Sequence, residues 1–116
     1  MKHFLAVFTG TPESMDGWKS LDPAQRQAKE QAGMEAWKAW VEKHQASIVD
    51  QGAPLGKTKR ISAGGITDIR NDMAAYNVVQ AESHEAAAKL FEQHPHFTIF
   101  PGDAVEVMEC LPMPGM

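Results

Sequence analysis

Residues Ala75–His96 read AYNVVQAESHEAAAKLFEQHPH, and this stretch predicts a strand, a capped helix and a helix stop. Neighbouring side chains of a strand point to opposite faces, and residues 75–81 carry apolar groups on both. A strand of this kind usually has both faces covered. Ser83 then occupies the N-cap position, and an apolar stripe follows at helical spacing. Pro95 disfavours helical geometry at His94 and ends the helix there.

The length and composition predict one folded domain, residues 1–111, followed by an irregular tail at residues 112–116. The chain has 116 residues, of which 43% are hydrophobic, and this composition argues against disorder. Its formal net charge of −4 lacks the positive charge that nucleic-acid binding requires, so we expect no nucleic-acid partner.

The single cysteine, Cys110, excludes an internal disulfide and is typical of a reducing compartment, so the sequence predicts a cytoplasmic protein. The apolar run Met1–Phe8 is too short for a signal-peptide core or a membrane span, so no membrane partner is expected. We interpret it as the start of the first strand.

The remaining segments alternate between strand and helix patterns. Lys2–Thr9 predicts a strand that is apolar on both faces, and Gly10–Leu21 predicts a long loop. Asp22–Ala46 predicts a helix with an N-cap at its first residue. Lys57–Ala63 predicts a half-exposed strand, residues 64–72 a loop with a Gly64-Gly65 turn, residues 96–103 another loop, and residues 104–111 the last strand. The predicted buried face of the long helix consists of Gly33, Ala36, Trp37, Trp40, Val41 and His44.

The order strand, helix, strand, strand, helix, strand predicts an α+β, ferredoxin-like βαββαβ fold with a four-stranded antiparallel sheet. Two helices cover only one sheet face, yet three strands are apolar on both faces. A second copy of the same sheet is the simplest cover for the other face. The pattern therefore predicts a homodimer that associates through its sheet faces. Gly33, within the long helix, marks either a close approach of another element or a tolerated weak position.

Several short motifs resemble the YCII-related family, also called the DGPF domain family. They are Tyr76–Glu82 with Ser83, His94-Pro95-His96, Gly52–Leu55 and Val105–Val107. The resemblance implies a dimeric α+β barrel with a pocket between sheet and helices. Separately, we expect no cofactor. The Asp-Gly-Pro-Phe motif of the family is replaced here by Thr67–Asp72, which keeps only an aspartate, and no histidine lies near the middle of the first long helix.

His3, His94 and His96 are the candidate catalytic residues, because histidine exchanges protons near neutral pH. At a helix C-terminus His94 is expected to favour its cationic form. Structural packing is the alternative for each of the three, and a metal site at His94 and His96 would require further ligands, so none is predicted. The candidate ligand-binding residues are Trp18, which we interpret as a lid, Trp37, Tyr76 and Arg60.

Polar residues on the strands allow two interpretations: they line a polar pocket, or they pair with Arg60 or Lys59 across the sheet or across the dimer. These residues are Asn77, Gln80, Glu82, Glu106 and Glu109. Lys57, Lys59 and Arg60 form a basic cluster that either receives an anionic ligand or protects a strand edge.

Two functions remain open from the sequence. One is a small-molecule enzyme that uses histidine acid–base chemistry without a cofactor. The other is a non-catalytic binding or regulatory module that acts through its dimer or a protein partner. Nothing in the sequence alone decides between these two functions.

Overall fold

A computed structural model describes residues 1–115, so the last residue of the expected tail lies outside the described part. Its centre is a four-stranded antiparallel sheet in the order β2–β5–β1–β6. The four strands are β1 (Lys2–Thr9), β2 (Ile48–Pro54), β5 (Met73–Ala81) and β6 (Ala104–Glu109). The expected α+β fold with a four-stranded antiparallel sheet is confirmed. No helix within residues 1–115 is both long enough and apolar enough to cross a bilayer.

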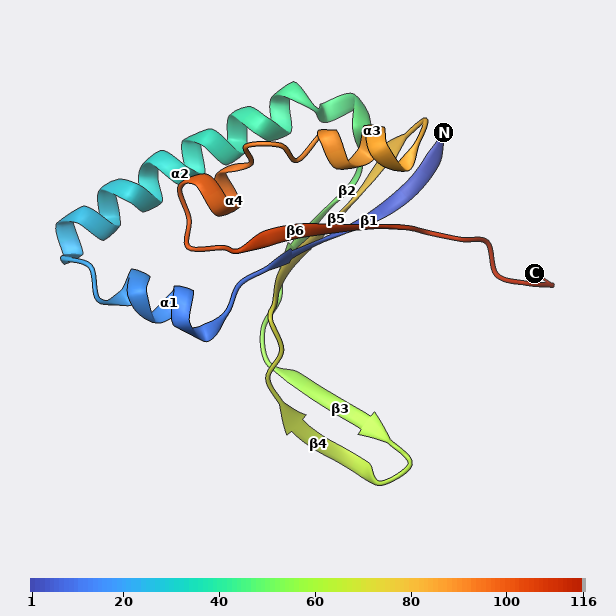
Figure 1. Ribbon diagram of the computed structural model, residues 1–116, viewed down its shortest axis with the longest axis horizontal. Coiled ribbons are helices and arrows are strands. Elements are labelled where there is room, and N and C mark those ends of the chain that lie inside the picture. Colours follow the sequence, from blue (N-terminus) through green and yellow to red (C-terminus); the bar gives the residue numbers. More distant parts are fainter. Residues whose placement is uncertain (116) are drawn as a thin grey trace.

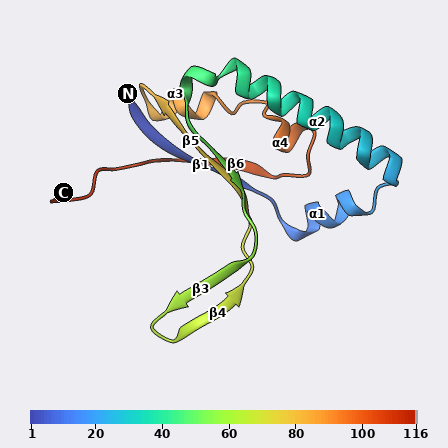
Figure 2. The ribbon, with the colours of Figure 1, turned by 180° about the vertical axis from the view of Figure 1, so that it is seen from behind.

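The helices are α1 (Pro12–Lys19), α2 (Pro23–Lys43), α3 (His84–Lys89) and α4 (Pro95–Thr98), with a short 3-10 turn at Gln45–Ser47. Helices α2, α3 and α4 lie over one face of the sheet, and α1 lies beyond the end of β1 (Figures 1 and 2). The core lies between sheet and helices and consists of Phe4, Ala6, Phe8, Trp40, Val79, Ala81, Ala87 and Phe91. The side chains at even positions of β1 therefore point to the helix-covered face, because successive side chains of a strand alternate between its two faces.

Helix α2 begins where the sequence predicts. The Asp22 side chain accepts hydrogen bonds from the N–H groups of Ala24 and Gln25, and Pro23 occupies the first turn. The helix ends at Lys43, and Trp40 donates its indole N–H to the Leu90 carbonyl at 2.8 Å. This bond joins α2 to the chain beyond α3.

Gly33 marks a close approach. A Cβ atom added at this glycine would lie 2.6 Å from the ring of Phe100, closer than van der Waals contact permits. The mid-helix glycine therefore admits an aromatic ring against the α2 backbone, and this decides between the two interpretations of Gly33.

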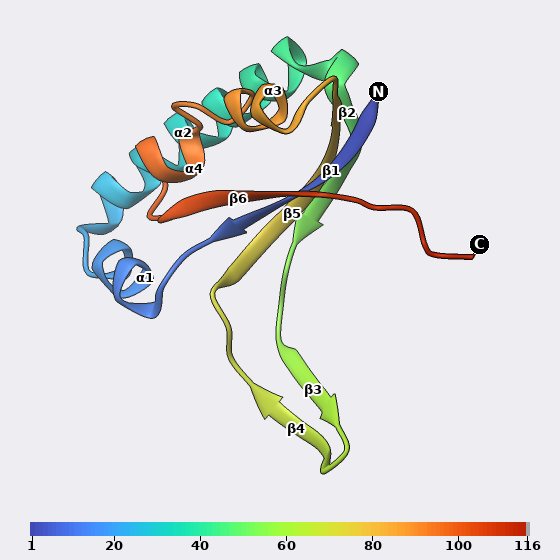
Figure 3. The same cartoon turned by 45° about the vertical axis from the view of Figure 1, so that its right-hand side comes forward.

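Three predictions about the secondary-structure elements are wrong. The second strand of the sheet is β2, whereas the expected strand at 57–63 pairs with part of the expected loop at 64–72. These two segments, β3 (Thr58–Ser62) and β4 (Gly65–Ile69), form a separate ribbon that projects to the side of the sheet opposite the helices (Figure 3). The alternation of residues 57–63 indicates a strand but carries no information about its partner.

The second and third corrections concern helices. The expected loop at residues 10–21 contains α1, because Thr11 caps Ser14 and Pro12 occupies the first turn. The expected helix from Ser83 to His94 stops at Lys89. His94 is instead the N-cap of α4, and most of α4 lies in the segment 96–103 that the sequence predicts to be a loop.

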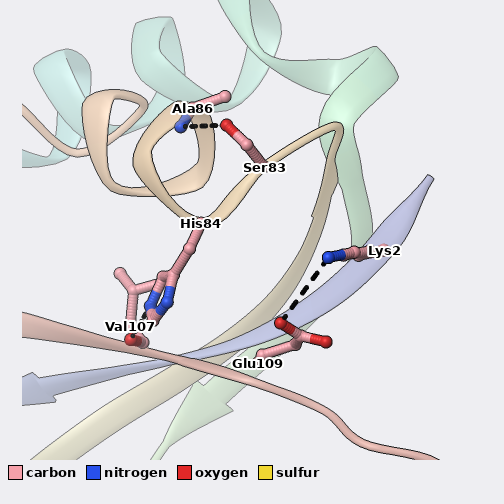
Figure 4. A network of polar contacts seen from close by, with 6 residues as sticks. All are labelled: Lys2, Ser83, His84, Ala86, Val107 and Glu109. Carbon is pink, nitrogen blue, oxygen red and sulfur yellow. Dashed lines mark hydrogen bonds and ion pairs between the residues drawn. The ribbon is translucent and has the colours of Figure 1, made fainter.

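Figure 4 shows polar contacts at one end of the sheet: one caps α3, one joins α3 to β6, and one links β1 to β6. Ser83 Oγ accepts the N–H of Ala86 at 3.0 Å, as the capping pattern predicts. The exposed His84 donates from Nε2 to the carbonyl of Val107 at 2.7 Å. Lys2 and Glu109, from the two neighbouring strands, lie 4.0 Å apart. The His84 bond therefore joins α3 to β6.

Candidate functional site

A cavity of about 600 Å³ lies between α1, α2 and the end of the sheet near β2. Its walls are mostly apolar and aromatic, which is typical of a small-molecule pocket. The lining residues that matter for its chemistry are Phe8, Met15, Trp18, Met34, Trp37, Asn77, His96 and Phe100. They come from separate segments of the chain, so only the folded state brings them together.

Aromatic rings build one wall of this cavity. Phe100 has its ring centre 5.8 Å from that of Trp18 and 6.1 Å from that of Trp37. Trp37 also lies 5.1 Å from Phe8, which rises from the central strand. Tilted and edge-on pairs at such distances are favourable for aromatic groups. The wall therefore offers flat, rigid surfaces against which a ring could stack.

His96 is the titratable group of the cavity whose protonation state the geometry defines. Its Nε2 lies 2.7 Å from the carbonyl oxygen of Thr9. A carbonyl only accepts, so Nε2 carries the proton and Nδ1 of the neutral ring is the free acceptor. Burial lowers the pKa of His96, while the Thr9 carbonyl and the Asp103 carboxylate act in the opposite direction. His96 is therefore neutral near pH 7, and no residue among 1–115 forms a hydrogen bond to its Nδ1.

His94 lies behind His96 and is fully buried. Its Nδ1 accepts the backbone N–H of His96 at 3.0 Å, so its own proton is on Nε2. That N–H has no hydrogen-bond partner among residues 1–115. The ring centre lies 4.5 Å from Trp37 and 4.7 Å from Trp40.

These surroundings overturn the expected cationic state of His94. Burial, followed by the neighbouring His96 and His44, lowers the pKa of His94 to about 3. The helix-end argument fails because His94 starts α4 instead of ending α3, and because aromatic rings replace water around it.

Asn77 brings an amide into the apolar cavity. Its side chain is only 4% exposed, and its Oδ1 has no hydrogen-bond partner within residues 1–115. A buried polar atom without a partner lowers stability by roughly 1–3 kcal/mol. Such an atom at a cavity wall is a natural contact for a polar ligand group. The pocket interpretation of this residue is therefore favoured over pairing with Lys59 or Arg60.

Asp103 holds the N-terminus of α1 against the rest of the domain. Its Oδ2 accepts the backbone N–H of Thr11 at 2.6 Å, and its Oδ1 accepts the hydroxyl of Ser14 at 2.8 Å. These bonds, the one to Ser14 first, lower the pKa of Asp103. Helix α1 carries Met15 and Trp18 into the cavity wall, so this carboxylate sets the position of that wall.

The structure brings four of the seven predicted site residues to this cavity: Trp18, Trp37, Tyr76 and His96. His94 supports His96 from behind. His3 is exposed on the open sheet face, and Arg60 is exposed on the projecting ribbon, so neither lines the cavity. Phe100 and Met34 were missed, because a loop phenylalanine and an exposed helix methionine carry no sequence signal for a site.

The other strand polar groups find different partners from those expected. Gln80 donates to the carbonyl of Ala46 at 3.0 Å, and Glu109 lies near Lys2. Lys59 contacts Asp68 within the ribbon at 2.7 Å. Among residues 1–115 no strand carboxylate pairs with Lys59 or Arg60, so pairing within one chain is wrong, and pairing across a dimer stays a prediction. Within residues 1–115 no three side chains of histidine, cysteine, aspartate or glutamate gather in a way that would hold a metal ion.

Comparison with known proteins supports the fold. The chain is similar to the solved structure of 5-chloro-2-hydroxyhydroquinone dehydrochlorinase from Burkholderia phenoliruptrix AC1100 in complex with 2,5-dihydroxybenzoquinone. The TM-score is 0.51 with 21% sequence identity, and the match covers 90% of this chain and 89% of the other. No family model matches the chain, and neither does any curated protein. The likeness shows the fold, and membership of the YCII-related family stays a prediction.

Proposed function

We propose that this protein binds a small hydroxylated aromatic compound in the cavity beside α2, and that His96 accepts a proton from a ligand hydroxyl. The observation that carries the proposal is the neutral His96, whose Nε2 is committed to the Thr9 carbonyl and whose Nδ1 is left as an acceptor. The aromatic wall suits a planar ring, and Asn77 supplies a polar contact for a second oxygen. A structure of similar fold holds 2,5-dihydroxybenzoquinone, which is also a planar hydroxylated six-membered ring.

The proton transfer has simple chemistry. The ligand O–H bond breaks, its electron pair stays on oxygen as a phenolate, and the proton moves to His96 Nδ1. Burial disfavours the resulting imidazolium, so His96 releases the proton readily, while the Asp103 charge limits that penalty. The imidazolium can return the proton to the leaving-group-bearing ring carbon while the phenolate oxygen becomes a ketone. Loss of a second hydroxyl proton then expels the leaving group with its bonding electron pair, as chloride in a chlorinated ring, and leaves a hydroxyquinone. This chain's own contribution is to orient the ring, exclude water and move the proton.

The proposal is tested by titrating the protein with 2,5-dihydroxybenzoquinone and following tryptophan fluorescence, since Trp18 and Trp37 line the cavity. We expect saturable quenching, weakened about tenfold in His96→Gln and in Asn77→Leu, because each loses one polar contact to the ligand. His3→Gln is the matched control, because His3 is exposed outside the cavity, and it should bind as the wild type does.

Chemistry is tested separately from binding. We expect chloride release from 5-chloro-2-hydroxyhydroquinone by the wild-type protein and a loss of about 100-fold in His96→Gln, the size typical of a removed acid–base group. Binding of the quinone without chloride release in the wild type would contradict proton transfer and leave a binding module. Absence of any quenching would contradict the site as a whole.

We also propose that two copies associate through the sheet face that carries no helices. Leu5, Val78 and Met108 lie side by side across three strands on this face. A contiguous uncovered apolar face of a sheet favours association.

Sedimentation tests the dimer. We expect a dimer at micromolar concentration and a folded monomer for Val78→Glu, because the new carboxylate would be desolvated in the centre of the contact. Ile66→Glu, at an exposed position of the ribbon, should remain dimeric. A monomeric wild-type protein would refute association through this face.

A further inference from the structure

A second hollow adjoins the aromatic cavity at the base of the projecting ribbon. It has a volume of about 880 Å³ and shares Gly10, Met15 and Ala74 with the first cavity. Met15, on α1, therefore lies between the two hollows. A methionine side chain is unbranched and changes conformation easily, so Met15 can move aside for a ligand that spans both hollows.

The second hollow is bordered by three basic residues. Lys57, Lys59 and Arg70 border it, together with the single carboxylate Asp68. Asp68 is engaged by Lys59 at 2.7 Å. Among residues 1–115, neither Lys57 nor Arg70 forms an ion pair with a carboxylate. Two basic residues that have no carboxylate partner among residues 1–115 therefore border this hollow.

The charge distribution along the chain strengthens this contrast. Residues 57–72 hold four of the 11 basic residues and only two of the 15 acidic ones, in a chain whose net charge is −4. Positive charge next to a hollow in a negative protein attracts an anion selectively. The apolar cavity on one side of Met15 and the unpaired cations on the other side suit a ligand with an apolar ring at one end and a negative charge at the other.

From this juxtaposition, and resting on the proposed function, we infer that the natural ligand is an aromatic acid. Its hydroxylated ring occupies the aromatic cavity, and a carboxylate on a short side chain extends past Met15 to Lys57 and Arg70. The basic cluster thus selects among ring compounds, while His96 and Asn77 engage the ring itself. Arg60, on the same ribbon, does not border the hollow and takes no part.

The test compares 3-(4-hydroxyphenyl)propanoate with its uncharged amide, using quenching of tryptophan fluorescence. We expect the wild type to bind the acid about tenfold more tightly than the amide, the effect of two exposed ion pairs. The double variant Lys57→Gln/Arg70→Gln should bind both equally and bind the amide as the wild type does. High salt should also weaken the preference, because the charges are exposed to solvent.

A charge-matched control separates the site from the general field of the protein. Arg60→Gln/Lys38→Gln removes two exposed positive charges that border neither hollow, and it should keep the preference for the acid. Equal binding of acid and amide by the wild type would overturn the inference while the ring site stands. Equal loss in both double variants would overturn it too, by assigning the effect to net charge. Binding of neither compound, nor of 2,5-dihydroxybenzoquinone, would remove the proposed function as well.

Discussion

Replacing Gly52 by alanine is expected to lower the free energy of unfolding by about 3–5 kcal/mol, from strained backbone and steric overlap acting together. Gly52 has a φ of +67°, in the left-handed region that side chains with a Cβ rarely adopt. A Cβ built there would lie 1.8 Å from the carbonyl oxygen of Tyr76 on the paired strand. Backbone cannot yield as a flexible side chain can, so β2 would have to separate from β5.

The position of Gly52 explains why so close an approach exists. The pairing of β2 with β5 shifts register between Asp50 and Ala53, so the strand is bulged there. Asp50 Oδ1 accepts the N–H of Gly52 at 2.8 Å and holds the bulge. Gly52 also lines the aromatic cavity, so loss of this geometry should weaken ligand binding together with stability.

Urea unfolding of matched variants measures the effect. Gly56→Ala is the control, because a Cβ there would meet nothing within 4 Å, and we expect a change within about 0.5 kcal/mol. Gly52→Asn distinguishes the two causes, since asparagine tolerates the left-handed region but has the same Cβ. Recovery of stability in Gly52→Asn would show that φ alone matters, and equal stability of Gly52→Ala and Gly56→Ala would refute the close approach.

The same bulge shows why part of the fold escaped prediction from the sequence. Residues 50–54 read DQGAP, which is typical of a turn, and only pairing with β5 makes them a strand. Lys57–Ala63 has the cleaner alternation, yet it lies outside the sheet. The alternation of side chains indicates that a segment forms a strand and which of its faces is apolar. The strand with which it pairs depends on contacts with residues distant in sequence.

Elements whose signals agree were predictable. In α2 the cap at Asp22, the proline after it and the apolar spacing all point to one helix, and Trp40 is buried as its spacing requires. The central strand β1 carries Phe4 and Phe8 at alternate positions, and both are buried against the helices. Local and tertiary preferences coincide in these elements, so the sequence suffices.

The candidate site was predictable only in its residue types. Tryptophan and histidine stood out as ligand-binding groups, and Trp18, Trp37 and His96 do line one cavity. The role of each histidine depends on a partner that the sequence does not identify: the Thr9 carbonyl for His96 and the ring of Trp37 for His94. Hydrogen-bond partners far apart in sequence decide the tautomer, and burial decides the charge.

The state of His94 has a second large consequence, a loss of stability in mild acid. The ordinary pKa of 6.5 is lowered to about 3 in the folded protein, so the native ring stays neutral while the unfolded chain takes up a proton. The contribution of His94 to the free energy of unfolding is fully present above pH 6.5. It falls as the pH drops toward 3, by up to about 1.4 kcal/mol per pH unit. At pH 4 the expected loss is about 3 kcal/mol. Burial also lowers the pKa of His96 and His44, which adds to the loss in the same direction.

His94→Asn isolates this contribution, because asparagine is a good N-cap acceptor for the His96 N–H and does not titrate. Carboxylates and the other histidines titrate in both proteins, so the difference between the two stability curves belongs to residue 94. Urea unfolding at intervals between pH 8 and pH 4 should show the wild type losing about 3 kcal/mol more than the variant. The absolute stabilities at pH 8 report the packing change alone, since His94 is neutral there in both the folded and the unfolded chain. Parallel curves would mean that His94 is solvated or charged in the folded protein, and the aromatic enclosure by Trp37 and Trp40 would then be refuted.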